Sequence, residues 1–151
     1  RYGNYESAGT VRGSEDGRPG QAKAYAAVEA FDYASWSDQL RGFLGNSGET
    51  MIRQEQKERK YNKSTHPARF QRIADNWDGI LKIMEEELPS ADTLAQVMDT
   101  IGISRDLQTI GVDRECARLT FKATKDIRDK YVLSRLAWDL GILEELAETL
   151  N

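Results

Sequence analysis

Apolar residues between positions 70 and 88 recur at intervals of three and four, and this spacing limits what the segment can fold into. A period near 3.6 places such residues on one face of an α-helix, whereas a strand needs strict alternation. The residues that carry the period are Phe70, Ile73, Trp77, Ile80, Leu81, Met84 and Leu88. The pattern predicts one helix of about five turns with this face in the core, ended by Pro89, which cannot continue a helix.

Helical patterns fill most of the remaining chain. Gly45 and Gly102 stand where helices commonly stop, while Ser35 or Ser37 and then Ser90 are N-cap candidates. The expected helices cover residues 21–33, 35–44, 49–63, 90–101 and 113–140, with a short one over 142–150. No segment shows period-two alternation bounded by turn residues. The sequence therefore predicts an all-α fold, an irregular multi-helix bundle without a nucleotide-binding sheet.

Length and composition limit the organisation of the chain. Its 151 residues suit one domain, and we expect a flexible or irregular lead-in over 1–20 and a single all-helical domain over 21–151. Cys116 is the only cysteine, so no disulfide can form within the chain. Because there is no apolar run of about 18 residues and no signal-peptide pattern, we expect a cytoplasmic protein that does not enter membranes. The net charge of −4 argues against a nucleic-acid partner.

The stretch KDIRDKYVLSRLAWDLG, residues 125–141, sets a dense charge cluster beside an apolar run. On a continuous helix, Lys125 and Asp129 lie four residues apart, as do Asp126 and Lys130, and opposite charges at this spacing pair along a helix surface. Residues 127 and 131 would then face the core. The pattern predicts an amphipathic helix with a solvated, ion-paired face.

The same stretch resembles the C-terminal signature of glycerol-1-phosphate dehydrogenase-like proteins, a branch of the iron-containing (metal-dependent) alcohol and glycerol dehydrogenase superfamily. That signature has the form I-R-D/E-R/K-Y-T/V-x-L followed by W/D-D-L/I-G, and residues 127–133 and 138–141 of this chain have that form. RFQRIADNWDGILKIMEEELPS, residues 69–90, is similar to the family's helix ending in E-L-P, and IGVDRE, residues 110–115, is similar to its turn. In order and spacing these motifs cover residues 31–145.

The resemblance implies the helical half of an NAD(P)-dependent polyol phosphate dehydrogenase. In that family an N-terminal α/β half binds the dinucleotide, and one aspartate and two histidines hold a divalent metal that polarises the substrate oxygen. This chain has a single histidine, His66, and its setting STHPARF does not have the form of either family histidine motif. We therefore expect no metal, cofactor-binding or catalytic residue in this chain. NAD(P) and a divalent metal are expected only if a missing N-terminal half is present.

Further candidate sites have simpler structural interpretations. His66 is expected to be a partly exposed residue near a helix start, and GNSG at 45–48 to be a helix–helix turn, since no strand precedes it. The acidic run 85–87 is expected to be a solvated helix end. Cys116 has arginines two residues away on either side, which can lower the pKa of a thiol, yet a packed thiol is favoured. Acidic residues interrupt the basic segment 53–63, which disfavours a nucleic-acid stripe.

Two functions of different class remain. In the first, the chain is the non-catalytic helical part of a glycerol-1-phosphate dehydrogenase-like enzyme, separate from the nucleotide-binding half. In the second, it is a free-standing helical protein that binds a partner or itself, and a homodimer is expected because an apolar face left without its half tends to be reburied. The three tryptophans, Trp36, Trp77 and Trp138, are interpreted as core or interface anchors. Any role of Arg128 and Tyr131 beyond packing stays open.

Overall fold

Every regular element in the described part of the chain is a helix, as the sequence predicted. The computed structural model describes residues 18–150, so most of the predicted lead-in over 1–20 lies outside the described residues. The α-helices are α1 (Gln21–Ala30), α2 (Tyr33–Leu44), α3 (Asn46–Glu58), α4 (His66–Asp75), α5 (Trp77–Glu87), α6 (Ala91–Thr100), α7 (Arg114–Ala123), α8 (Leu133–Asp139) and α9 (Leu143–Glu148). Two short 3-10 helices are η1 (Leu107–Ile110) and η2 (Thr124–Asp126).

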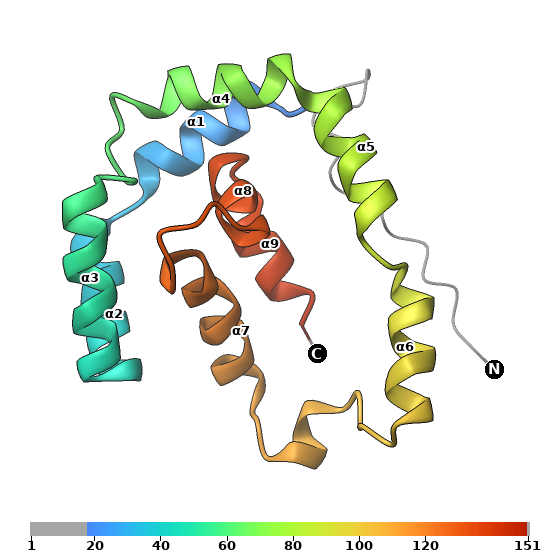
Figure 1. The fold of residues 1–151 in the computed structure, drawn as a ribbon. Coiled ribbons are helices and arrows are strands. Elements are labelled where there is room, and N and C mark those ends of the chain that lie inside the picture. Colours follow the sequence, from blue (N-terminus) through green and yellow to red (C-terminus); the bar gives the residue numbers. More distant parts are fainter. Residues whose placement is uncertain (1–17, 151) are drawn as a thin grey trace.

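The first six α-helices follow an arc, and the C-terminal helices lie inside it (Figure 1). Helix α8 is central, since it packs against α1, α4, α9 and η2. Six of its seven residues are buried, whether apolar or charged, and only its first residue, Leu133, is exposed. The core residues nearest to α8 are Ala24, Val28, Phe70, Ile73, Trp77, Leu140 and Leu143. The core therefore joins the two ends of the described chain.

Helices α2 and α3 form a tight hairpin on one limb of the arc (Figure 1). The side chain of Asp32 caps α2 by accepting from the amides of Ala34 and Ser35, so the predicted serine cap was wrong. The predicted stop at Gly45 is confirmed, since this residue has a φ of 53°. A Cβ at Gly48 would overlap the carbonyl oxygen of Leu40, so a glycine is needed where the two backbones meet.

The predicted helix over residues 70–88 is two helices, α4 and α5, which meet at Asn76. The side-chain amide of Asn76 donates to the carbonyl of Arg72 over 2.8 Å, and such local bonds compete with regular helix geometry. Phe70 and Trp77 are buried as predicted. Ile80 still packs partly against this core, but the chain has left it by Leu88, which is 45% exposed.

Helix α6 begins and ends as predicted but does not lie in the core. The Ser90 side chain accepts from the amide of Thr93 over 3.1 Å, which confirms the N-cap. Gly102 follows the helix with a φ of 72°. The expected core face is instead largely exposed, with Ile101 61% accessible. We call residues 77–101, which include α5 and α6, the arm.

The long helix predicted over 113–140 is interrupted. Helix α7 begins after Asp113, as expected, and ends at Ala123, η2 follows, and residues 127–132 are not helical. Ile127 and Tyr131, which were expected to face the core, are 53% and 55% exposed. The expected break near Gly141 is confirmed: its φ is 70°, and a Cβ there would lie 2.9 Å from the carbonyl oxygen of Lys23. The position therefore needs glycine for its backbone angle and for its close contact with α1.

Candidate functional site

Four of the seven charged residues in the stretch 125–141 are buried, so the predicted solvated, ion-paired face was wrong for these four, while residues 128–130 are exposed. Lys125 is 1% exposed, Arg135 2% and Asp139 0%. The physical reason is that the helix is interrupted at residues 127–132. The chain changes direction there, and the charged side chains before and after the interruption turn toward the core. Buried charges need partners, because an unpaired ion in a low-dielectric interior is costly. Residues from other helices provide those partners and form a buried charge network.

Asp126 is the acceptor at one end of this network. The indole Nε1 of Trp36 donates to its Oδ2 over 2.8 Å, and the hydroxyl of Tyr61 donates to Oδ1 over 2.6 Å. Lys125 adds an ion pair to the same carboxylate at 3.1 Å. One carboxylate thus ties η2 to α2 and to the loop between α3 and α4. The predicted pairing of Asp126 with Lys130 is replaced by this cluster.

Lys125 occupies a pocket of aromatic rings. Its Nζ lies 3.5 Å from the ring centroid of Trp36 and donates to the carbonyl of Lys122 over 3.1 Å. Burial lowers the pKa of Lys125 to about 8, although the neighbouring Asp126 opposes the shift. A lysine with such a pKa can act as a nucleophile at neutral pH. Because its amine is enclosed, the geometry supports a structural role.

Arg135 lies between two aromatic rings. The centre of its guanidinium is 4.5 Å from the ring centroid of Tyr61 and 4.6 Å from that of Trp138. Its Nη1 and Nη2 are buried and have no hydrogen-bond partner among the described residues. Cation–π contacts hold the group in place, as is common for arginine beside tryptophan and tyrosine.

Glu55 of α3 is the acidic residue beside this arginine. Its Oε1 accepts from the backbone amide of Tyr61 over 2.9 Å, while its buried Oε2 has no hydrogen-bond partner in the described chain. Burial raises the pKa of the Glu55 carboxyl, and the amide of Tyr61 and the charge of Arg135 partly offset this rise. The charged form of Glu55 is therefore less favoured here than it is in water.

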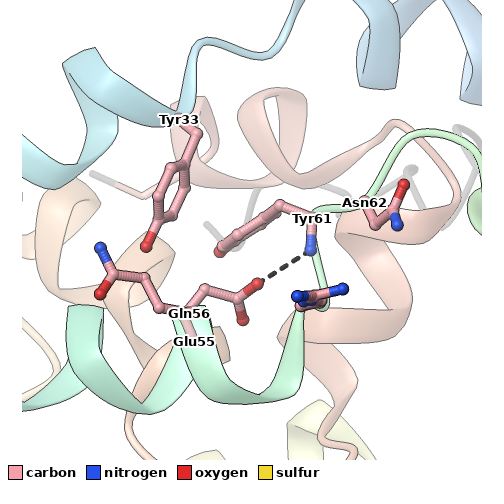
Figure 2. Close-up of a pocket in the computed structure, with 6 residues that line it drawn as sticks. Tyr33, Glu55, Gln56, Tyr61 and Asn62 are labelled. Atoms are coloured by element: carbon pink, nitrogen blue, oxygen red, sulfur yellow. Dashed lines mark hydrogen bonds between the residues drawn. The ribbon is translucent and has the colours of Figure 1, made fainter.

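Glu55 also lines a shallow open groove of about 390 Å³. Figure 2 shows the rings of Tyr33 and Tyr61 next to each other, with Gln56 and Asn62 on either side of them. The remaining lining residue is Arg59, which ends α3 in the left-handed conformation, with a φ of 54°. These groups can contact a small polar molecule, but no nucleophile lies among the lining residues with a base beside it.

Asp139 is the acceptor at the other end of the buried charge network. Arg69 donates from Nε to both of its carboxylate oxygens, over 2.8 and 2.9 Å, and its Nη2 pairs with Oδ1 at 2.8 Å. The Tyr131 hydroxyl donates to Oδ2 over 2.7 Å, so this half-exposed ring has its polar end turned inward. The pair of Asp139 and Arg69 joins α8 to α4, and Arg69 also donates to the carbonyl of Lys60.

His66 was expected to be partly exposed, and this was wrong, since it is 1% exposed. Its Nε2 lies 2.9 Å from the carbonyl oxygen of Asp139. A carbonyl oxygen can only accept, so Nε2 carries the proton in this contact. The rings of Tyr25, Phe70 and Trp138 surround the imidazole. His66 thus joins α4 to α8 within the core.

The other candidate positions lie apart from this network. Cys116 is partly buried on α7, with its backbone amide bonded to Asp113. The neighbouring Arg118 pairs with Glu148 over 2.8 Å. The glycine-containing segment 45–48 forms the turn into α3 and the helix's first residues, while the acidic run 85–87 is exposed at the end of α5. None of these positions takes part in the contacts around Asp126 or Asp139.

Sequence reasoning missed the residues that hold the network together. The sequence patterns place Asp126 on a helix surface, Asp139 and Arg69 in the motifs of the resemblance, and Glu55 on a polar helix. One local signal existed: Arg135 and Asp139 interrupt an otherwise apolar run, which is typical of charges that are buried with partners. The partners themselves come from distant parts of the chain and leave no local pattern.

Comparisons with protein-family models, curated proteins and solved structures found no match for this chain. Within residues 18–150, no group of three or more histidine, cysteine, aspartate or glutamate side chains is arranged to hold a metal ion. None of the helices in that range has the length and apolar character needed to cross a bilayer.

Proposed function

We propose that this chain is a non-catalytic helical domain that works by packing against another protein surface. It would correspond to the C-terminal helical half of a metal- and NAD(P)-dependent glycerol-1-phosphate dehydrogenase-like protein. The order of the motifs between residues 31 and 145 supports this ancestry. The all-helical fold is compatible with this ancestry but does not test it, because many unrelated proteins are all-helical.

The observation that carries the binding role is the exposed apolar face of the arm. Six of its large apolar side chains are 42% to 61% exposed, whereas Trp77 at its start is buried. The six are Leu81, Ile83, Leu88, Leu94, Val97 and Ile101. Several large exposed apolar side chains on one segment are typical of a site where another protein surface packs. The arm therefore needs a partner to become buried.

The residues present do not fit the metal that the resemblance implies. That metal needs an aspartate and two histidines, and this chain has His66 alone, whose Nε2 already contacts the carbonyl of Asp139. We therefore assign no metal-binding or dinucleotide-binding residue here. Those groups would belong to an N-terminal half if the natural gene product contains one.

A second candidate is a free-standing helical protein that acts through self-association. The same exposed arm favours it, because a surface that once contacted a partner half can be reburied in a dimer. The two candidates differ in the polypeptide that covers the arm. They also differ in the size of the natural gene product.

Two measurements test the proposal. Purified chain supplied with zinc, NAD and glycerol 1-phosphate is expected to transfer no hydride above a metal-free control, and turnover would overturn the non-catalytic role. An immunoblot of source cells then separates the two candidates. A band well above twice the 17.1 kDa of this chain supports the dehydrogenase half, whereas a band at 17.1 kDa supports the free-standing protein.

A further inference from the structure

The charges around the apolar face of the arm are almost all of one sign. Six exposed acidic side chains accompany a single lysine, Lys82, and one of the six, Asp99, pairs with Arg105 just beyond the arm. The acidic residues are Asp78, Glu85, Glu86, Glu87, Asp92 and Asp99. Two arms packed against each other would bring these like charges together, which is unfavourable. The surface that covers the arm is therefore expected to be apolar with a basic rim.

This chain has such a surface on the other side of its fold. Ile127, Tyr131 and Leu133 are 53%, 55% and 52% exposed. Four exposed basic side chains lie on the same segment or on the adjoining end of α3, and Lys60 joins the two parts by donating to the carbonyl of residue 128 over 3.0 Å. They are Lys57, Arg59, Arg128 and Lys130, and the exposed Asp129 lies between the last two, so the surface keeps an excess of positive charge. We call this surface, with its three apolar residues, the basic patch.

A groove lies next to the basic patch and has the character of a helix-binding site. Its volume is about 520 Å³, and Leu44, Met51 and Ile127 line it together with polar residues of α3. On the arm, residues 94 and 97 of α6 and residue 101, which directly follows the helix, have the spacing by which amphipathic helices enter apolar grooves. The apolar row at α6 and the partly apolar groove can therefore pack together, and the basic residue Arg128 directly follows Ile127 of the groove.

The arm and the basic patch of one chain cannot meet without a large movement. Helix α6 lies at the open end of the arc, on the opposite side from α2 and α3 (Figure 1). Two copies can satisfy both surfaces at once if each places its arm on the other, which gives a closed two-fold arrangement. A closed pair also leaves no unmatched surface from which a filament could grow.

We propose that two copies of this chain associate by reciprocal docking, with the α6 face of each arm in the groove beside Ile127 of the other copy. This inference rests on the proposed binding role of the arm and names what covers it. The acidic rim of the arm then meets Arg128 and Lys130 of the basic patch. Association weakens with salt, because exposed charge pairs are screened.

The decisive experiment uses complementary charge reversals in the full chain. One variant carries Glu85→Lys, Glu86→Lys and Glu87→Lys, which place favourable charge at the C-terminal end of α5 and so leave the helix intact. The other carries Arg128→Glu and Lys130→Glu, both at exposed positions. Sedimentation velocity of the unaltered chain should give a dimer of twice 17.1 kDa. Each variant alone should bind itself roughly 100-fold more weakly, and an equimolar mixture should recover the dimer.

A matched pair of substitutions tests the apolar contact. Ile101 on the arm and Ile110 on η1 are both 61% exposed, and only Ile101 lies on the proposed interface. Ile101→Ser should weaken the dimer at high and low salt, while Ile110→Ser should leave it unchanged. Circular dichroism of each variant confirms that it has folded.

Three results would overturn the inference: an unaltered chain that stays monomeric at about 100 μM, well above a micromolar Kd; reversed variants that still dimerise alone; or a mixture that fails to recover the dimer. None of them bears on the hydride-transfer assay, so this inference can fail while the proposed binding role stands. Turnover in that assay would overturn the proposed function without affecting the dimer.

Discussion

Replacing Asp139 by asparagine should destabilise the protein far more than the same change at an exposed aspartate of the same segment. Asp139 is 0% exposed and accepts from Arg69 and from the hydroxyl of Tyr131. An asparagine has the same shape but one acceptor oxygen, and its amide hydrogens would face the guanidinium donors of Arg69. The change therefore removes the charge and opposes donor to donor.

The size of the effect follows from the partners. Breaking a buried ion pair costs about 3–5 kcal/mol because a charge is left unpaired. The side chain of Arg69 is 24% exposed and can turn partly to water. We therefore expect about 2–4 kcal/mol for Asp139→Asn. For a chain of this length that corresponds to a fall in Tm of roughly 4–16 °C.

The assay is urea unfolding followed by circular dichroism, with Asp129→Asn as the matched control. Asp129 is exposed on the segment between η2 and α8, and its substitution should change the free energy of unfolding by less than about 0.5 kcal/mol. Tyr131→Phe removes one hydrogen bond to Asp139 and should cost about 1 kcal/mol. If the two asparagine variants unfold at the same urea concentration, the network around Asp139 does not stabilise the fold.

Three further predictions concern other parts of the structure. The pKa of Lys125 is about 8 in the folded chain and 10.5 ordinarily, so the unfolded chain binds more protons between these two pH values. The free energy of unfolding should therefore rise with pH in this range. Lys125→Met should abolish the rise in a pH series of urea melts. Glu55→Gln should leave stability at pH 7 unchanged or higher, since burial raises the pKa of that carboxyl and already disfavours its charge; a loss above about 1 kcal/mol would contradict this. Gly48→Ala should destabilise the protein by more than about 1 kcal/mol, because the added Cβ overlaps with Leu40. Gly42→Ala is the control in the same hairpin: its Cβ position has open space around it, so thermal melts should show a neutral or stabilising effect.

Local signals in the sequence were sufficient for several helix ends. Ser90 and Asp113 cap helices as predicted, and Gly45, Gly102 and Gly141 end them. Each of these features depends on a few neighbouring residues, because a cap or a left-handed glycine acts within one turn. The all-helical class followed from the same period of three and four.

Tertiary contacts decided the features that sequence reasoning missed. The apolar period runs through Asn76 without a gap, so nothing in the spacing marks the break where α5 leaves the core. In the charged stretch, spacing by four suits an ion-paired surface as well as a buried network. The choice depends on Trp36, Tyr61 and Arg69, which are far away in the sequence. No local pattern reveals such partners.

The close contact at Gly141 has a consequence for how the chain folds during synthesis. Helix α1 packs against α8, and its Lys23 pairs with Glu145 of α9 over 2.6 Å. The first and the last described helices therefore stabilise each other. While the chain is being made, α1 and α4 leave the ribosome before α8 exists, and their apolar faces have no native surface to cover them. A nascent chain halted before Leu133 should therefore remain open to proteases and chaperones, and its long-range core can close only after translation has passed α9.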